Sequence, residues 1–213
     1  MSLKQASLLL RRPRMYPQRL RLPLHTTSHA KETKTVPQRM KYFLVWASLM
    51  MALNPAWAQT SPPETATGKI GNATLVIKYC APSVRGRQIF GEGGRVMSDP
   101  TAPIWRAGAN DATAFHTDAD LNIAGLAVPK GDYTLYVNVK DPDAWELVIN
   151  KQTGQWGTNY DASQDLGRVK MEMRKPPAPM EVLKYTITST GGNKGTIQLA
   201  WEKHIASVSV MAK

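Results

Sequence analysis

The chain has 213 residues and a formal charge of +11, a basic balance that often indicates a nucleic-acid or membrane-surface partner. The charge is concentrated before residue 59, where ten lysines and arginines accompany a single acid, Glu32, whereas residues 59–213 carry a net charge of only +2. Because those residues also lack a basic stripe with interleaved aromatic side chains, we expect no nucleic-acid partner.

An export signal is predicted at residues 40–58, inside the chain. Residues 39–41 carry two positive charges, residues 42–53 form an uncharged and mostly apolar run, and residues 56–58 ("AWA") place small side chains where signal peptidase requires them. Cleavage is expected after Ala58. The apolar run is shorter than the about 20 residues that span a bilayer. We therefore expect no membrane span after cleavage and a periplasmic or extracellular location.

The residues before the signal leave three interpretations open. In the first, Met40 is the initiator and residues 1–39 are a non-native or disordered upstream extension. In the second, these Arg-rich and acid-poor residues are a targeting extension. In the third, the signal is an uncleaved anchor and its positive charge keeps residues 1–39 in the cytoplasm. The first is favoured because Lys41 follows Met40 directly, as in an initiator before a positive region.

Two regions are expected after the signal. Residues 59–72 contain Pro, Thr and Gly and are predicted to be a flexible leader. Residues 73–213 have the size of one domain. Cys80 is the only cysteine of the chain, so no internal disulfide is possible and the domain must depend on its apolar core.

Short segments of alternating polarity predict strands through most of residues 73–213. The predicted strands are 74–79, 114–117, 121–123, 134–139, 145–150, 169–173, 182–189, 196–202 and 208–210. The clearest pair is a hairpin with one solvent-exposed face. Leu183, Tyr185 and Ile187 lie on its apolar face, and residues 191–195 form the turn. About eight or nine short strands without a helical segment favour an all-β fold, an antiparallel β-sandwich.

Familiar catalytic and metal-binding patterns are missing from the predicted domain. Its two histidines, His116 and His204, do not have the spacing of metal ligands. No nucleophile elbow, zinc-protease helix or phosphate-binding glycine loop occurs. The sequence thus predicts no cofactor and no metal, and it leans away from an enzyme.

One long irregular loop, residues 82–113, interrupts the strand pattern and concentrates polar side chains. Its polar and aromatic side chains include Arg85, Arg87, Arg95, Asp99, Trp105, Arg106, Asn110 and Asp111. Long connections inside compact domains are uncommon and often functional, and arginine forks suit carboxylates, phosphates and sulfates. The competing interpretation is that these arginines pair with Asp99, Asp111 or backbone carbonyls and only staple the loop.

The leading hypothesis is a binding module for an unknown small polar or anionic ligand. Arginines would donate to the ligand, tryptophans would form apolar walls, and Asn110 and Asp111 would orient it. The candidate residues are Arg85, Arg87, Trp105, Arg106, Asn110, Asp111, Trp156 and Tyr160. One alternative is an envelope-associated hydrolase or isomerase with Asp111 as base, although a nearby arginine would lower the pKa of that carboxyl. Another is a structural or interaction protein.

Four blocks of the sequence stand out, "YCAPSVRGRQIFG", "IWRAGANDATAFHTDADLNIAG", "VPKGDYTLYV" and "WELVINKQTGQWGTNYD". Their order and spacing resemble the bacterial family called domain of unknown function 2911, and the resemblance runs from about residue 73 to residue 210. Members of that family typically carry signal peptides, which agrees with the predicted export. The resemblance implies no activity, substrate or catalytic residue. This chain has Asp111 where the family usually has Glu, and "MSDPTAPIW" replaces a clearer "VPYG" segment.

Overall fold

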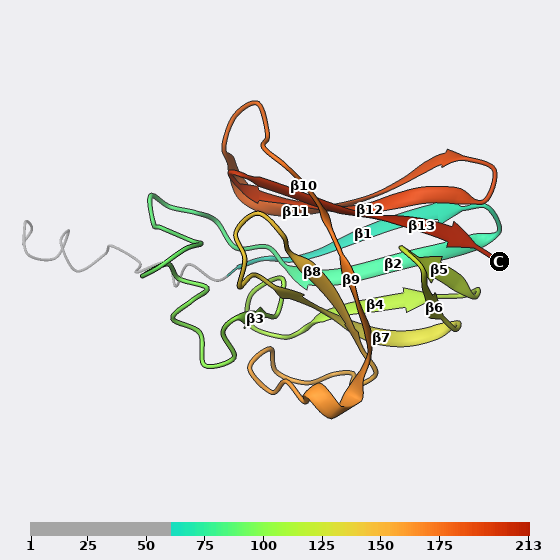
Figure 1. The fold of residues 1–213 in the computed structure, drawn as a ribbon, viewed down its shortest axis with the longest axis horizontal. Coiled ribbons are helices and arrows are strands. Elements are labelled where there is room, and N and C mark those ends of the chain that lie inside the picture. Colours follow the sequence, from blue (N-terminus) through green and yellow to red (C-terminus); the bar gives the residue numbers. More distant parts are fainter. Residues whose placement is uncertain (1–60) are drawn as a thin grey trace, which may run out of the picture. The chain divides into compact units, whose positions relative to one another are not determined.

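The computed structural model describes residues 61–213, all of which belong to one compact unit. The predicted export signal and residues 1–39 lie outside the described residues. Thirteen strands within residues 61–213 form two antiparallel sheets that pack face to face, as Figure 1 shows. The predicted all-β sandwich is thereby confirmed. In this described part of the chain no helix is long and apolar enough to cross a membrane.

The two sheets draw their strands from alternating parts of the chain. The seven-stranded sheet contains, in spatial order, β1 (Pro63–Ile70), β2 (Ala73–Cys80), β4 (Thr113–Thr117), β7 (Gly131–Asn138), β8 (Glu146–Asn150) and β9 (Asp165–Lys170), with β3 (Ile104–Trp105) also paired to β7. The six-stranded sheet contains β11 (Met180–Gly191), β12 (Lys194–Glu202), β13 (His204–Ala212), β5 (Leu121–Ile123) and β6 (Leu126–Val128), with β10 (Glu172–Arg174) also paired to β13. A short 3-10 helix, η1 (Ala162–Gln164), precedes β9.

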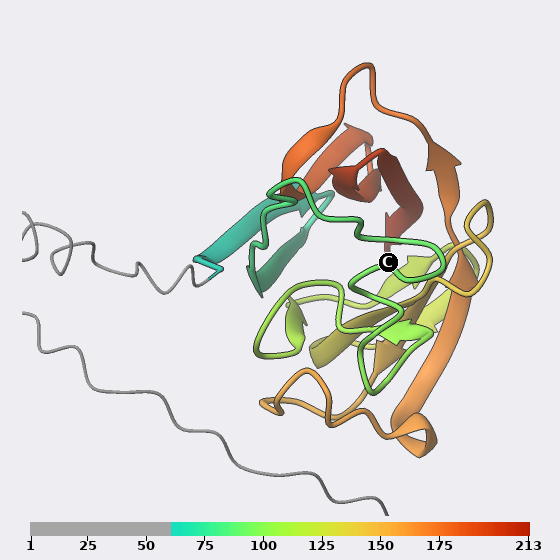
Figure 2. The ribbon, with the colours of Figure 1, turned by 90° about the vertical axis from the view of Figure 1, so that its left-hand side faces the viewer.

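The core lies between the sheets, where the apolar side of each alternating strand faces inward. In β2, Leu75, Ile77 and Tyr79 are buried whereas Lys78 is exposed, as the alternation predicts. The predicted hairpin is formed by β11 and β12, and it buries Leu183 and Tyr185. Figure 2 looks along the sandwich and shows the two layers on either side of this interior.

One edge of the sandwich is closed by a segment that belongs to both sheets. Strand β9 pairs with β8 in the seven-stranded sheet, and β10 pairs with β13 in the six-stranded sheet. Only Met171 separates the two strands, and its amide donates to the Trp145 carbonyl at 2.9 Å. Figure 1 shows this chain crossing from one layer to the other. The segment 169–173, predicted as a single strand, is therefore divided between two sheets.

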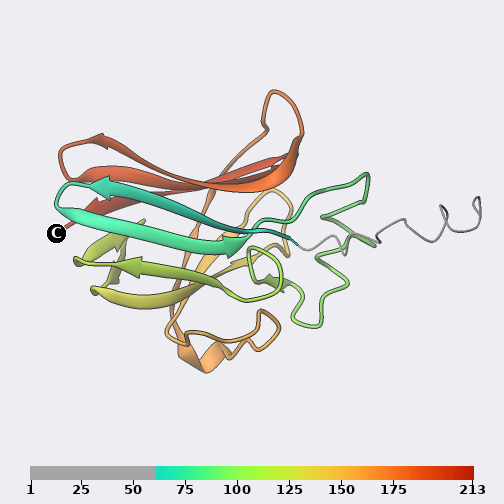
Figure 3. The same cartoon turned by 180° about the vertical axis from the view of Figure 1, so that it is seen from behind.

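The opposite edge is closed by β1 and by the residues that follow β2. Figure 3 shows β1 and β2 running beside the six-stranded sheet. Beyond β2, Ser83 forms an isolated bridge with Val182 at the start of β11. The Val84 amide donates to the Glu181 carbonyl at 2.8 Å, so the long loop begins as part of the seam between the sheets.

The prediction of a flexible leader is wrong for residues 63–70, which form strand β1. This strand pairs with β2 over its whole length, from Pro63 opposite Cys80 to Ile70 opposite Ala73. Pro at the first residue of an edge strand loses no necessary hydrogen bond, and Gly inside a strand permits a close approach of another chain segment. The prediction of a leader was based on composition, which does not show that residues 63–70 pair with β2. The short strands β3 and β6 were also not predicted.

Replacing Gly68 by alanine should destabilise the domain, because its backbone lies directly against Ile187 of β11. A Cβ at this position would lie 2.5 Å from Ile187 Cγ2 and 3.1 Å from the Ile187 carbonyl oxygen. We expect Gly68→Ala to lower the free energy of unfolding in urea by about 1–3 kcal/mol, a typical cost of overpacking. Thr67→Ala, on the exposed side of the same strand, is the control. Equal stability of both variants would mean that β1 does not pack on β11.

Candidate functional site

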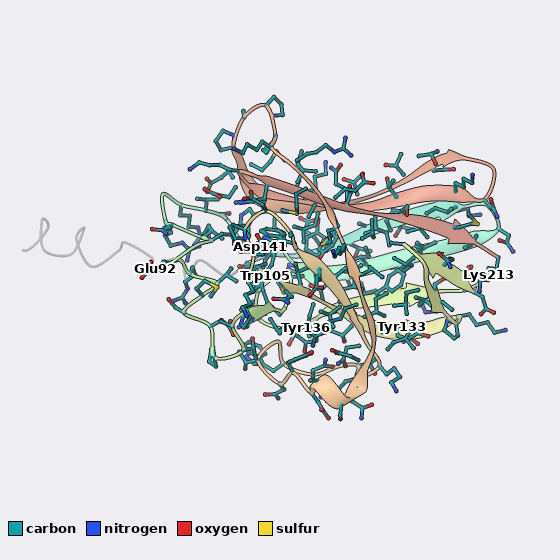
Figure 4. The ribbon with its side chains drawn as sticks, viewed as in Figure 1. Glu92, Trp105, Tyr133, Tyr136, Asp141 and Lys213 are labelled. Atoms are coloured by element: carbon teal, nitrogen blue, oxygen red, sulfur yellow. The ribbon has the colours of Figure 1, made fainter. Side chains whose placement is uncertain are left out.

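A cavity of about 360 Å³ lies at the end of the sandwich that the long loop covers. Its lining includes five of the eight candidates: Arg85, Arg87, Trp105, Arg106 and Asn110. The remaining lining residues are Ser61, Pro82, Ser83, Arg95, Val96, Ser98, Asp99, Pro100, Gly108, Ala109 and Trp201. In Figure 4, Trp105 marks this end of the domain and Lys213 the opposite end. The structure thus brings most of the predicted arginine cluster to one concave surface.

The first wall of the cavity is a tight turn over residues 84–87. Arg85 and Gly86 both have positive φ, 51° and 66°, and the Arg87 amide donates to the Val84 carbonyl at 3.0 Å. The Arg85 amide donates to a Glu181 carboxylate oxygen at 2.8 Å, which ties the turn to β11. For a residue other than glycine the left-handed conformation is costly, so the contacts with β11 must hold Arg85 in it.

The Arg87 guanidinium is fixed by the turn that it follows. Its Nε donates to the Val84 carbonyl at 3.0 Å and one terminal nitrogen, Nη2, donates to the Ser83 carbonyl at 2.6 Å. Both acceptors are neutral, so these bonds orient the guanidinium and leave its positive charge uncompensated. A donor with fixed orientation loses little side-chain entropy when it binds an anion.

Arg106 is held by an internal partner. It forms an ion pair with Asp99, and its Nη1 donates to the Asn110 carbonyl at 3.2 Å. The Arg106 side chain is only 13% exposed, and a Cβ at Gly157 would overlap its Cδ. For this arginine the geometry favours the interpretation as a loop staple, since its charge is compensated and its stem is packed.

Trp105 borders the cavity but belongs to the core. It is 3% exposed and stacks on Trp201 with ring centroids 5.5 Å apart, while Phe90 meets it edge-on. Its Nε1 donates to the Gly108 carbonyl at 3.2 Å. A ring enclosed in this way has no open face, so the expected stacking wall for a ligand is not present at Trp105.

Three candidates lie outside the cavity lining. Asp111 and Trp156 form an isolated bridge with each other, Asp111 is exposed, and Trp156 is 49% exposed. Tyr160 packs on Tyr136 at the outer face of the seven-stranded sheet, and its hydroxyl donates to Asp165 at 2.7 Å. Burial, and then the bond to Asp165, raise the pKa of Tyr160 to about 12. These residues fasten the 151–164 segment rather than shaping the cavity.

The candidate set omitted cavity residues that sequence reasoning had partly noticed. Arg95 and Asp99 stood in the long loop, and both line the cavity. The Arg95 side chain is exposed and, within residues 61–213, makes no hydrogen bond or ion pair. Ser61 precedes β1 and Trp201 lies in β12, so both are outside the loop in sequence, and no local pattern marks them.

An aromatic group that includes His204 lies beneath the loop. Its ring stacks on Trp145 with centroids 5.0 Å apart and meets Phe90 edge-on at 4.9 Å. His204 Nδ1 lies 3.3 Å from a Glu202 carboxylate oxygen, but the geometry does not make a hydrogen bond, and this buried nitrogen has no other partner among the described residues. Burial lowers the pKa of His204 below its usual value of 6.5, although the negative charge of Glu202 acts to raise it.

Residues 61–213 contain no group of three or more His, Cys, Asp or Glu side chains that could hold a metal ion.

The fold and the cavity together define a β-sandwich protein with an arginine-lined cavity at one end. The chain belongs to the family described as "Protein of unknown function (DUF2911)", whose model matches residues 61–210. The match confirms the family resemblance and includes β1. Comparison with curated proteins and with solved structures gives no match.

Arg106→Ala should destabilise the domain, because it leaves the mostly buried Asp99 carboxylate without its charged partner. We expect the free energy of unfolding to fall by about 1–3 kcal/mol, the cost of an unsatisfied polar group. Arg95→Ala, which removes an exposed side chain from the same cavity, should change it by less than about 0.5 kcal/mol. Urea titration of both variants measures the difference. Equal losses would show that Arg106 is not a staple.

The stability of the domain should depend on the protonation of His204. Because the folded pKa lies below the unfolded value, the unfolded chain binds a proton first, and stability is lost as pH falls below about 6.5 through the folded pKa. His204→Phe keeps an aromatic ring beside Trp145 without the titration. Its free energy of unfolding should therefore fall less than that of the wild type between about pH 7 and pH 5. Parallel pH profiles would contradict this account.

Proposed function

We propose that this protein is an exported binding module for a small anionic ligand, which it holds in the arginine-lined cavity. The observation that carries the proposal is the charge of the lining: four arginines and one carboxylate surround about 360 Å³. This volume lies in the range of small-molecule sites, about 300–1,000 Å³. Export rests on the predicted signal at residues 40–58.

The conformation of the cavity walls supports a binding role. Arg85 and Asn110 line the cavity with positive φ, and Ala107 between them also has positive φ. Residues other than glycine keep this conformation only where neighbouring contacts impose it, and such residues are common at binding sites. The cost of holding the loop is consistent with a fixed arrangement of donors.

The two alternative functions have less support from the geometry. An enzyme with Asp111 as base would need this carboxylate in the cavity, and Asp111 is not part of the lining. The surface of an interaction protein is expected to expose a contiguous apolar patch. The exposed large apolar residues within 61–213 lie on separate elements: Met97, Trp156, Val182 and Met211.

A thermal-shift screen of the mature domain with acetate, phosphate, sulfate and citrate at constant ionic strength tests the proposal. At an anion concentration of about 100 times Kd, binding should raise Tm by about 5–10 °C. Arg87→Ala should remove most of this shift, because it deletes an oriented cation. The control is Arg174→Ala in β10, an exposed arginine outside the cavity.

The proposal is wrong if no anion stabilises the wild type. It is also wrong if Arg87→Ala responds to the anions as the wild type does, since binding would then occur elsewhere.

A further inference from the structure

The cavity lining compensates only part of its own positive charge. Arg106 is paired with Asp99, the only carboxylate among the lining residues. Arg87 is bonded to the neutral carbonyls of Ser83 and Val84. Arg95 makes no ion pair within the described residues. At least two arginines of the lining, Arg87 and Arg95, therefore have no acidic partner among the described residues.

The remaining walls offer little to a neutral ligand. Trp105 and Trp201 are 3% and 2% exposed, so neither presents an open ring to a sugar or an aromatic compound. Ser83, Ser98 and Asn110 add polar groups to the lining but no charge. Affinity must then come mainly from charge-assisted hydrogen bonds to the guanidinium groups, which are stronger than those between neutral groups.

From these charges we infer that the ligand carries at least two negative charges close together, as a phosphate or sulfate group or a di- or tricarboxylate does. This inference rests on the proposed function and narrows its ligand class. A ligand with one charge would leave a guanidinium of the cavity uncompensated. A dianion can engage Arg87, which is already oriented, together with Arg95, whose exposed side chain can turn toward it.

Asp99 has a further role in this account, as an internal counter-charge. One Asp99 oxygen accepts from the Thr101 amide and hydroxyl at 3.2 and 2.9 Å, and the other binds Arg106. Asp99→Asn can keep the oxygen that binds Thr101, and it removes the negative charge and releases Arg106. The variant should therefore bind multivalent anions more tightly than the wild type, whereas a purely structural role would predict equal or weaker binding.

Isothermal titration calorimetry of the mature domain with matched ligands tests the inference. Succinate and butyrate have the same chain length and differ by one carboxylate, and phosphate at pH 8 and citrate add two other multivalent anions. We expect at least one of the three multivalent anions to bind about tenfold or more tightly than butyrate, because hydrogen bonds to a second charged group contribute about a factor of ten or more.

The variants locate that preference in the cavity. Arg87→Ala and Arg95→Ala should each weaken binding of the preferred anion about tenfold or more, whereas Arg174→Ala should leave it unchanged. Asp99→Asn should strengthen it severalfold, with urea titration to confirm that the variant is folded.

The outcomes separate the inference from the proposed function. If butyrate binds as tightly as every multivalent anion and Arg87→Ala weakens it, the protein binds anions but the inference is overturned. If Asp99→Asn is folded and does not strengthen binding, the counter-charge role is overturned. If none of these anions binds at all, both the inference and the proposed function fail.

Discussion

The backbone pairing between residues 82–84 and the start of β11 determines the geometry of the whole cavity end. The Leu183 amide donates to the Pro82 carbonyl at 3.0 Å, and the Val84 amide donates to the Glu181 carbonyl at 2.8 Å. These bonds fasten the start of the long loop to the six-stranded sheet, although the preceding strand, β2, belongs to the other sheet. The turn that carries Arg85 and Arg87 is thereby held between the two layers.

The arginines of the loop have different physical roles although they are chemically identical. Arg106 is compensated by Asp99 and packed against Gly157, so it supports the wall. Arg87 is oriented by neutral carbonyls and retains its charge, and Arg95 has no acidic partner in the described residues. The ion pair of Arg106 and the carbonyl bonds of Arg87 both fit the loop-staple interpretation, whereas the proposed ligand site depends on the charges that Arg87 and Arg95 retain.

The sequence predicts the sandwich well because period-two alternation records which face of each strand is buried. Leu183 and Tyr185 are examples. It misses β1, because the pairing of β1 depends on β2 and on the space that Gly68 leaves for Ile187. It predicts the arginine cluster from loop length, but it cannot show that Trp105 is enclosed by Trp201, a contact between distant segments.

Native-state hydrogen exchange at the Val84 and Leu183 amides tests most directly whether the cavity has a rigid frame. Slow exchange reports bonds that open only with a large part of the fold. If the seam holds the loop as described, both amides should exchange as slowly as those in the centre of β7. Exchange of both amides at the rate of the exposed glycines near residue 93 would contradict the account, because the arginines would then have no fixed arrangement.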